Sequence, residues 1–341
     1  MRDHFSLGRI RNVDLSNVHK VYEKWPDMAL SGFDAEFNLP RTGFLKAYVL
    51  GMGGSAAGGD IIASWISDRP EFEVATFKGQ LPTRNMRDVL AIACSASGQT
   101  KETIEMMEAA VRRGATTVSI SAGGKLMEVS KRLGVPHVMM PEVVAPRYML
   151  PFIIFSCFSI INEGLGLDCE DEAEGAFKEM EVERRVVGIN APASKNPSKR
   201  LALSVLEKTP VIYGSRPTFG AGIRFKNVIN ENAKRHAIFD ELPDVFHNEI
   251  EAWNDPRRKF APVFLRHSAE TERDRAGADA MVEILSELEM DPVEVRGRGK
   301  SSLAQLVTMV YRLDMASYYL AIGTGRDPLP TTLINRLKER T

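Results

Sequence analysis

The chain has 341 residues, of which 44% are hydrophobic and 26% are charged, and this composition excludes a chain that is disordered over most of its length. A length above the roughly 250–300 residues at which single cores stop growing predicts two compact domains. The formal net charge is −1, so no global field would draw the protein to nucleic acid or to an anionic membrane. An anionic ligand must therefore be held by a local site.

Three features bear on the compartment. The longest nearly unbroken apolar run, residues 149–161, contains Pro151 and is shorter than the roughly 20 residues that span a bilayer. The N-terminus lacks the apolar core of a secretory signal. The three cysteines, Cys94, Cys157 and Cys169, have the spacing of neither a disulfide framework nor a metal site. We therefore expect a reduced, cytoplasmic protein without a transmembrane helix.

Short apolar runs alternate with helical patterns over the first half of the chain. The expected strands are residues 47–50, 72–77, 89–93, 116–120 and 137–140, and the expected helices end near residues 66, 111 and 133. Strands separated by helices of ten to fifteen residues favour parallel pairing with right-handed crossovers. This half is predicted to form a doubly wound sheet covered on both faces.

The second half repeats this organisation after a change of composition. Residues 166–200 are acidic and then rich in Pro, Ser and Lys, which predicts a surface helix and a linker. Further strands are expected at 209–214, 237–239 and 261–265, with helices over 218–235 and 301–322 and a short helix after Pro330. The predicted fold class is α/β, with two doubly wound parallel-sheet, flavodoxin-like domains at 1–165 and 166–341.

A glycine-rich segment, residues 51–60, lies between the first strand and its helix. Glycines there let backbone N–H groups approach an anion at a helix N-terminus. The spacing from Gly51 also satisfies the dinucleotide pattern G-x-G-x-x-A, but that site needs an acidic residue at the end of the second strand. Glu71 and Glu73 stand near its start instead. A tight turn with a close helix–strand contact is the structural alternative.

Three hydroxyl residues follow the next buried strand: Ser95, Ser97 and Thr100. The carboxyl end of a parallel strand that opens into a helix also presents free backbone donors. Hydroxyls together with amides suit a terminal phosphate with three acceptor oxygens, although one of these residues could simply cap the helix. The turn therefore favours a phosphate monoester over a dinucleotide.

Six motifs together resemble one family. They are Gly53-Gly54-Ser55, the turn Ser95-x-Ser97-Gly98-x-Thr100, Ala145-Pro146-Arg147, Asn230-Glu231-Asn232-Ala233-Lys234, His247-Asn248-Glu249 and Leu337-Lys338. In this order they resemble the bifunctional phosphoglucose/phosphomannose isomerases, which are built from two sugar-isomerase (SIS) domains. The resemblance runs from about residue 20 to the C-terminus. One departure is Lys101, where the family often has an acidic residue.

The resemblance implies a metal-independent aldose–ketose isomerase that interconverts glucose 6-phosphate and mannose 6-phosphate with fructose 6-phosphate through an enediolate. It implies a place in glycolysis and gluconeogenesis, no cofactor, and a homodimer whose active site lies at the subunit interface. The substrate-binding residues that match the family are Gly53, Gly54, Ser55, Ser95, Ser97, Thr100 and Thr331.

Four residues match catalytic positions of the family, and a fifth matches a specificity position. The resemblance makes Glu231 the base, His247 the ring-opening residue acting in the partner subunit, and Lys338 its assistant. Arg147 would stabilise the enediolate, and an arginine beside a long apolar stretch should in any case face an anion. Thr331, seven residues before Lys338, would leave room for both C2 epimers; the alternative is an N-cap of the last helix. For Glu231 and Lys338 the alternative is an ordinary solvated side chain, and for His247 it is a packing or surface role.

Two other functions compete with this interpretation. A non-catalytic SIS-type sugar-phosphate sensor would carry a helix-turn-helix and a basic face, and the first 40 residues lack that pattern. A metal-dependent phosphomannose isomerase on a β-barrel needs clustered His and Glu ligands, but the sequence has no His-x-His pair. We therefore expect sugar phosphates as partners, and neither a metal nor nucleic acid.

Overall fold

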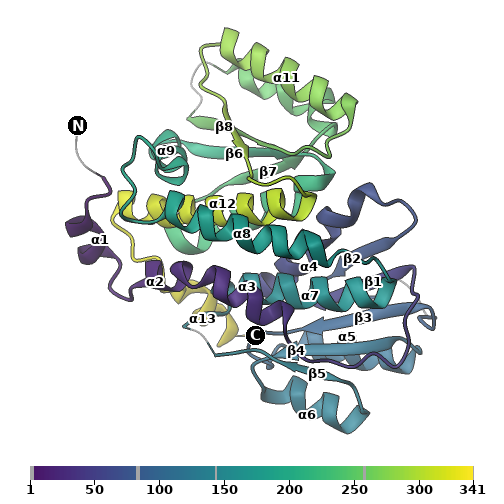
Figure 1. The fold of residues 1–341 in the computed structure, drawn as a ribbon. Helices are drawn as coiled ribbons and strands as arrows, with labels where there is room; N and C mark the ends of the chain where they lie inside the picture. The colour runs from purple at the N-terminus through teal and green to yellow at the C-terminus, as the bar shows by residue number, and fades with distance from the viewer. Residues whose placement is uncertain (1–3, 82–84, 143, 256–258, 341) are drawn as a thin grey trace. The chain divides into compact units, whose positions relative to one another are not determined.

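The computed structural model describes residues 4–81, 85–142, 144–255 and 259–340 (Figure 1). The chain forms two compact units. The first-sheet unit comprises Lys24–Lys178 and Gly299–Leu306, and the second-sheet unit comprises Met1–Glu23, Glu179–Arg298 and Val307–Thr341. Each unit is built around one parallel sheet.

This grouping differs from the sequence-based division between residues 165 and 166. The division between the units falls inside helix α8 (Glu170–Val187). Phe177 in its first half packs against Phe33 and Phe155 of the first-sheet unit. Glu183 in its second half pairs with Arg312 of the second-sheet unit. Composition marks the change of pattern near residue 165, but packing partners decide to which unit each turn of the helix belongs.

The first sheet confirms the strands expected in the first half of the chain. Its strands are β1 (Lys46–Gly51), β2 (Glu73–Phe77), β3 (Val89–Cys94), β4 (Thr116–Ser121) and β5 (His137–Met139). All of its pairings are parallel, in the order β2-β1-β3-β4-β5. This is the doubly wound order, in which the chain reverses direction beside β1.

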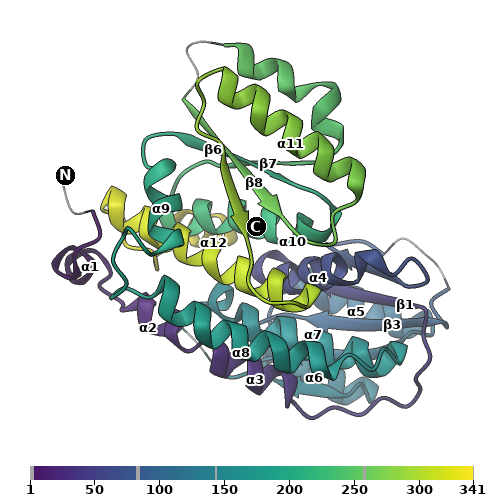
Figure 2. The same cartoon turned by 45° about the horizontal axis from the view of Figure 1, so that its top comes forward.

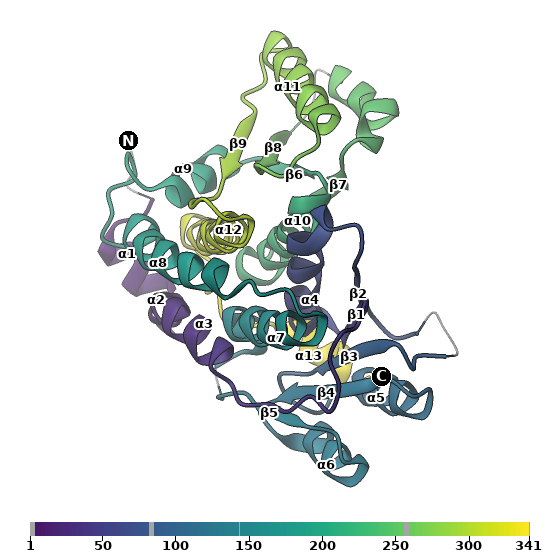
Figure 3. The ribbon, with the colours of Figure 1, turned by 45° about the vertical axis from the view of Figure 1, so that its right-hand side comes forward.

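Helices cover both faces of this sheet. They are α3 (Trp25–Phe33), α4 (Gly53–Trp65), α5 (Lys101–Arg112), α6 (Gly124–Leu133) and α7 (Leu150–Leu165), with short 3₁₀ turns at η1 (Ile66–Asp68) and η2 (Pro146–Met149). Tyr48 and Leu50 pack under α5 and α6. Val49 and Leu90 point to the other face, against α4 and α7. Figure 3 shows α5 and α6 on one side of the sheet and α7 with α3 on the other.

The longest apolar run of the sequence is the core helix of this unit. The segment Pro146–Leu165 has the length and apolar composition of a membrane-crossing helix, and 89% of its 18-residue window is buried inside the structure. Gly58 of α4 allows this close packing, because a Cβ there would lie 2.5 Å from Ile153 Cγ2. Burial against α3, α4 and the sheet accounts for the apolar composition.

The second sheet repeats the arrangement with one strand fewer. Its strands are β6 (Thr209–Gly214), β7 (Ile238–Glu241), β8 (Phe260–Arg266) and β9 (Val293–Arg296), all parallel in the order β7-β6-β8-β9. Tyr213 and Phe264 pack against Met281 of α11 (Glu272–Glu287). Figure 2 shows α11 on one side of this sheet and α10 (Phe219–Val228) on the other. The prediction of two doubly wound α/β domains is confirmed.

The remaining helices of the second-sheet unit come from both ends of the chain. They are α1 (Leu7–Val13), α2 (Val18–Glu23), α9 (Pro197–Ser204), the π-helix η4 (Ile229–Ala233), the 3₁₀ turns η3 (Arg216–Thr218), η5 (Asp244–His247) and η6 (Glu249–Asn254), and α13 (Thr332–Lys338). Helix α12 (Ser302–Thr324) starts in the first-sheet unit and continues in the second-sheet unit.

The segment expected as a linker is more ordered than its composition indicates. Residues 197–204 form α9, and Asn196 and Lys199 beside its start are buried. The Lys199 ammonium donates to the carbonyls of Ile189 and Ala191, both at 2.8 Å. A Pro/Ser/Lys composition is therefore compatible with a packed helix when each polar group has an internal partner.

Candidate active site

The carboxyl ends of β1 and β3 lie side by side, with Gly51 paired to Cys94. Each strand leads through a short loop into a helix, α4 or α5. Gly53 at the start of α4 has a φ of +52°, a left-handed conformation that favours glycine. Ser55 joins the two loops, because its Oγ accepts the backbone N–H of Ala96 at 3.0 Å. The glycine loop and the hydroxyl turn are thus one structure at one edge of the sheet.

The hydroxyl turn leaves the start of its helix without a side-chain cap. Thr100 occupies the N-cap position of α5, but its Oγ1 accepts the Ser95 hydroxyl at 2.9 Å and caps no backbone group. Met52 at the N-cap position of α4 also makes no side-chain cap. Two helix N-termini, each with a partial positive charge, therefore open at the same edge. The hydroxyl of Ser97 is exposed and accepts the N–H of Gln99 at 3.2 Å.

Arg147 belongs to this assembly. A Cβ at Gly54 would lie 3.3 Å from the Arg147 Cα, so the glycine lets η2 approach the loop. Arg147 is 5% exposed, its guanidinium stands over the Tyr148 ring at 4.5 Å from the centroid, and Nη2 donates to the Tyr148 hydroxyl at 3.0 Å. The structure therefore brings together the residues predicted in the first-sheet unit: Gly53, Gly54, Ser55, Ser95, Ser97, Thr100 and Arg147.

Glu231 lies half-buried in the π-helix η4, which directly continues α10. A π-helical turn is wider than an α-helical one and is frequent at functional sites. The next residue, Asn232, is fully buried and donates to the Tyr22 hydroxyl at 3.0 Å and to the Ser317 hydroxyl at 2.9 Å. The segment that carries Glu231 is thereby fastened to α2 and α12.

Lys234 connects this segment to the C-terminal helix. Its ammonium donates to the carbonyls of Asp327 at 2.6 Å and Pro328 at 3.2 Å. Thr331 follows at the N-cap position of α13, the position that its alternative role as a helix cap predicts. Its side chain, however, makes no capping hydrogen bond. Lys338 is exposed in the last turn of α13. The structure thus ties the loop before Thr331 to the helix end that carries Glu231.

His247 stands apart from these groups. It ends η5, is exposed, and its ring has no hydrogen bond or ion pair with the residues that the structure describes. Its motif neighbour Glu249 is held inside the unit, where it accepts the hydroxyl of Tyr213. Burial raises the pKa of the Glu249 carboxyl. Trp253 Nε1 donates to the same Tyr213 oxygen at 2.8 Å. The structure does not bring His247 to Glu231 by a hydrogen bond.

No sequence pattern indicated the buried ion pair beside the Glu231 segment. Arg224 on α10 is 1% exposed and Asp314 on α12 is fully buried. Arg224 Nε donates to Asp314 Oδ1 at 3.0 Å and Nη2 donates to Oδ2 at 2.6 Å. Ninety residues separate the partners, so no local pattern could have revealed them. Among the described residues, no group of three or more His, Cys, Asp or Glu side chains could hold a metal ion.

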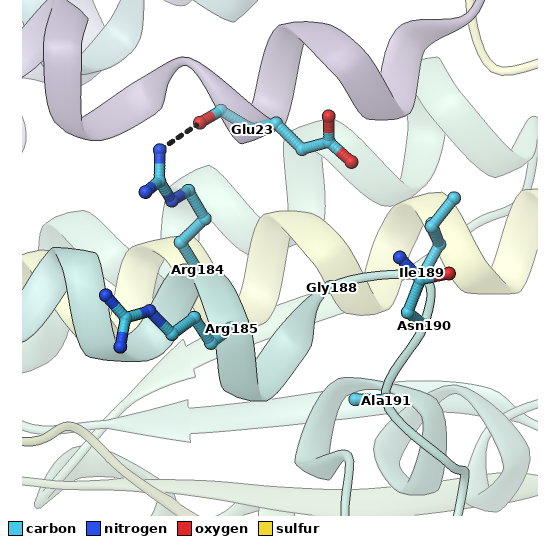
Figure 4. A pocket seen from close by; sticks show the side chains of 7 residues that line it. All are labelled: Glu23, Arg184, Arg185, Gly188, Ile189, Asn190 and Ala191. Carbon is cyan, nitrogen blue, oxygen red and sulfur yellow. Dashed lines mark hydrogen bonds between the residues drawn. The ribbon is translucent and has the colours of Figure 1, made fainter.

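A cavity of about 390 Å³ lies in the second-sheet unit at the end of α8 (Figure 4). Its lining consists of Glu23, Arg184, Arg185, Gly188, Ile189, Asn190 and Ala191. Arg184 closes one side, where Nη1 donates to the Glu23 carbonyl at 3.5 Å. None of the predicted site residues lines it, so we do not assign it to the active site.

Comparison with known proteins agrees with this architecture. The glucose-6-phosphate isomerase like protein from Thermus thermophilus has a structure that superposes with a TM-score of 0.64, at 21% identity over 100% of both chains. The family model "Bacterial phospho-glucose isomerase C-terminal SIS domain" matches residues 194–341. Fold and site therefore define a protein with two SIS domains.

Two relatives span nearly the whole chain. The bifunctional phosphoglucose/phosphomannose isomerase of Aquifex aeolicus (strain VF5) is 33% identical over 95% of this chain and 98% of its own length. This chain belongs to that family and is an enzyme, an isomerase, which decides against the non-catalytic sensor. The D-glucosamine-6-phosphate 4-epimerase of Sulfolobus acidocaldarius is 28% identical over 95% of this chain and 98% of its own length.

Proposed function

We propose that the enzyme interconverts glucose 6-phosphate and mannose 6-phosphate with fructose 6-phosphate, without a metal or a cofactor. One observation carries the proposal: two uncapped helix N-termini, three hydroxyl residues and Arg147 gather at one edge of the first sheet. Backbone donors at a helix N-terminus favour an anion, and the hydroxyls offer further donors to a terminal phosphate. A phosphate monoester matches this donor set.

Glu231 is the proposed base. It removes the proton from C2 of the open-chain aldose and returns it to C1, while a second proton moves from the C2 hydroxyl to the carbonyl oxygen at C1. The carbonyl thereby moves from C1 to C2 with no net oxidation. A positioned carboxylate contributes about 10²–10⁴ in rate. Its half-buried position, next to the firmly held Asn232, supports this role.

The other groups act before and after this step. His247 moves the proton that opens the sugar ring, with Lys338 assisting, and Arg147 stabilises the negative charge of the enediolate. The exposed ring of His247, without a partner among the described residues, supports a homodimer in which each histidine serves the other subunit. Thr331, whose hydroxyl caps nothing, leaves room for both C2 epimers. We place the enzyme in the cytoplasm, in glycolysis and gluconeogenesis.

The test is an assay with fructose 6-phosphate that detects both aldose products, before and after treatment with EDTA. We expect both products and no effect of EDTA. Glu231→Gln should lower kcat at least roughly 100-fold and abolish deuterium exchange at C2, whereas Glu287→Gln on the exposed end of α11 serves as the matched control. Exchange at the wild-type rate in Glu231→Gln would overturn the assignment of the base.

A second candidate function is 4-epimerisation of glucosamine 6-phosphate, which the name of the Sulfolobus relative suggests. The same phosphate-binding edge would hold that substrate, so the edge does not separate the two reactions. Nuclear magnetic resonance of a mixture with glucosamine 6-phosphate would detect the C4 epimer. We expect no epimer; its formation at a rate above that of fructose 6-phosphate turnover would reverse the order of the two proposals.

A further inference from the structure

The motif His247-Asn248-Glu249 contributes only its histidine to the reaction scheme above. Its glutamate is half-buried, and the carboxylate accepts the hydroxyl of Tyr213, a fully buried residue of β6. Trp253, which is 3% exposed, donates its indole N–H to the same hydroxyl oxygen at 2.8 Å. Tyr213 therefore joins both Glu249 and Trp253 of η6 to the core of the second-sheet unit.

The chain before His247 is attached to the same core by packing. Val245 in η5 is fully buried. Phe246 packs closely on α11, because a Cβ at Gly277 would lie 2.3 Å from Phe246 Cε2. His247 and Asn248 follow as two exposed residues before η6 begins. The exposed imidazole thus stands on a short turn that is fixed on both sides.

Asn248 connects the two sides of this turn. Its amide oxygen accepts the backbone N–H of Glu249 at 2.5 Å, and its amide nitrogen donates to Asp244 Oδ2 at 3.3 Å. The first bond caps η6 and the second reaches back to the start of η5. A movement of Glu249 would therefore also move the backbone that carries His247.

We propose that Glu249 is a positioning residue that, through Tyr213, holds the turn on which His247 is presented for ring opening. The inference rests on the proposed role of His247. Proton transfer requires donor and acceptor within hydrogen-bond reach, and a misplacement of about 1 Å can lower a rate roughly 100-fold. Because the exposed imidazole has few contacts of its own in the described structure, its backbone is the part that the protein can fix.

A purely structural role is the alternative, since a buried tyrosine hydroxyl that loses its acceptor destabilises a fold wherever it lies. The first strand of the other sheet supplies the matched control. Tyr48 on β1 is 3% exposed and donates its hydroxyl to Glu73 at 2.6 Å. Glu73 begins β2 and carries no proposed catalytic residue beside it. Tyr48→Phe therefore removes the same kind of bond without touching a turn that serves the reaction.

The first test compares Glu249→Ala with Glu249→Gln. The amide oxygen of glutamine still accepts the Tyr213 hydroxyl, whereas alanine removes the acceptor. We expect Glu249→Ala to lower kcat on glucose 6-phosphate about 10- to 100-fold per folded molecule, and Glu249→Gln to stay within about three-fold of the wild type. A wild-type kcat in Glu249→Ala, or an equal loss in both variants, would overturn the proposal.

A double-mutant cycle with His247→Ala separates positioning from general destabilisation. Spontaneous ring opening of the sugar supplies the residual turnover of that variant. If Glu249 acts through His247, adding Glu249→Ala to His247→Ala should change kcat less than about two-fold. A structural defect would lower kcat by the same factor in both backgrounds, which contradicts the proposal.

Tyr213→Phe keeps the cycle decisive if Glu249→Ala does not fold, because it retains the aromatic ring and removes only the hydroxyl. It should lower kcat as Glu249→Ala does, and only when His247 is present. Tyr48→Phe should lower the melting temperature and leave kcat per folded molecule unchanged. If Tyr213→Phe and Tyr48→Phe have the same effect on kcat, Tyr213 has a purely structural role and the proposal fails.

Ring opening is measured by itself in the Glu231→Gln background, as exchange between the α and β anomers of glucose 6-phosphate in nuclear magnetic resonance spectra. This exchange needs no proton transfer at C2. We expect both His247→Ala and Glu249→Ala to slow it. If His247→Ala leaves it unchanged, the proposed role of His247 fails, whatever Glu249 does. If only His247→Ala slows it, the proposed function stands and the inference about Glu249 fails.

Discussion

The two sheets of this enzyme have the same strand order over four strands, but the loops after their equivalent strands are chemically different. Strand β3 lies next to β1, the first strand of its sheet, and strand β8 lies next to β6, the first strand of the other sheet. Both β3 and β8 lead into a helix. After β3 the chain continues with Ser95 to Thr100, which leaves α5 without a side-chain cap. After β8 it continues with His267 to Thr271, and the Thr271 hydroxyl caps α11 by accepting the N–H of Asp274.

The second loop also contains its own anion. The Glu270 carboxylate accepts the backbone N–H of His267 at 2.6 Å and binds Arg266 Nε at 3.2 Å. Arg266 is 2% exposed and further pairs with Asp279 and Glu294, both at 2.7 Å. The start of α11 after β8 is therefore capped internally, whereas the start of α5 after β3 is not. The two sheets thus share their strand order, but the loops after β3 and β8 differ in side-chain chemistry, and this difference agrees with the proposal that substrate phosphate binds at the first sheet.

The largest effect should come from a substitution that distorts the hydroxyl turn after β3. Gly98 has a φ of +65°, and a Cβ there would lie 1.8 Å from the Gly123 carbonyl oxygen, so Gly98→Ala should cost at least about 3 kcal/mol and abolish turnover. Gly166→Ala, at a φ of +70° with open space around it, should cost only about 1–2 kcal/mol and preserve activity. Chemical denaturation and the isomerase assay measure both, and equal losses in the two variants would show that the contact with Gly123 is unimportant.

The second edge is expected to affect stability and not catalysis. Glu270→Gln removes one partner of the buried Arg266 and should lower the free energy of unfolding by about 2–3 kcal/mol, since Asp279 and Glu294 still pair with the guanidinium. The value of kcat/KM per folded molecule should be unchanged. A rise in KM for fructose 6-phosphate would indicate that the loop after β8 also contacts substrate, which would contradict a purely structural role for that loop.

Thr331 tests whether the second-sheet unit contributes specificity in place of phosphate binding. Thr331→Gln should lower activity on mannose 6-phosphate roughly ten-fold more than activity on glucose 6-phosphate, because a larger side chain restricts the space near C2. Since the Thr331 hydroxyl makes no capping bond, loss of a cap does not confuse the result. Kinetics on both aldoses decide the matter, and parallel losses would remove Thr331 from the specificity assignment.

The smallest expected effect concerns a single hydroxyl. Ser97→Ala should raise KM about three- to ten-fold with kcat nearly unchanged, because it removes one hydrogen bond to the phosphate in ground and transition states alike. The matched control is Ser268→Ala in the equivalent loop of the second sheet, where KM should not move. If both variants behave alike, the hydroxyl of Ser97 does not contact the substrate.

Much of the fold followed from local sequence patterns. Buried parallel strands are short apolar runs bounded by glycine and polar turns, so β1, β3, β4, β6 and β8 were predicted within a residue or two. Other elements were not predicted: β9 is only four residues long, α11 buries few apolar side chains, the N-terminal helices α1 to α3 are short, and α9 lies in the segment expected as a linker. Their stability comes from tertiary packing, which a local pattern does not contain.

The proposed phosphate-binding edge follows from contiguous motifs alone, because parallel strands necessarily carry their loops to one side of a sheet. The surroundings of the proposed base depend instead on how distant segments pack. The pairing of Arg224 with Asp314 and the attachment of Asn232 to Tyr22 and Ser317 join segments between 85 and 210 residues apart. The same holds for the division of α8 between the two units. Charge pairs and packing partners are chosen by three-dimensional proximity, and single-sequence periodicity reports only the face that a residue occupies.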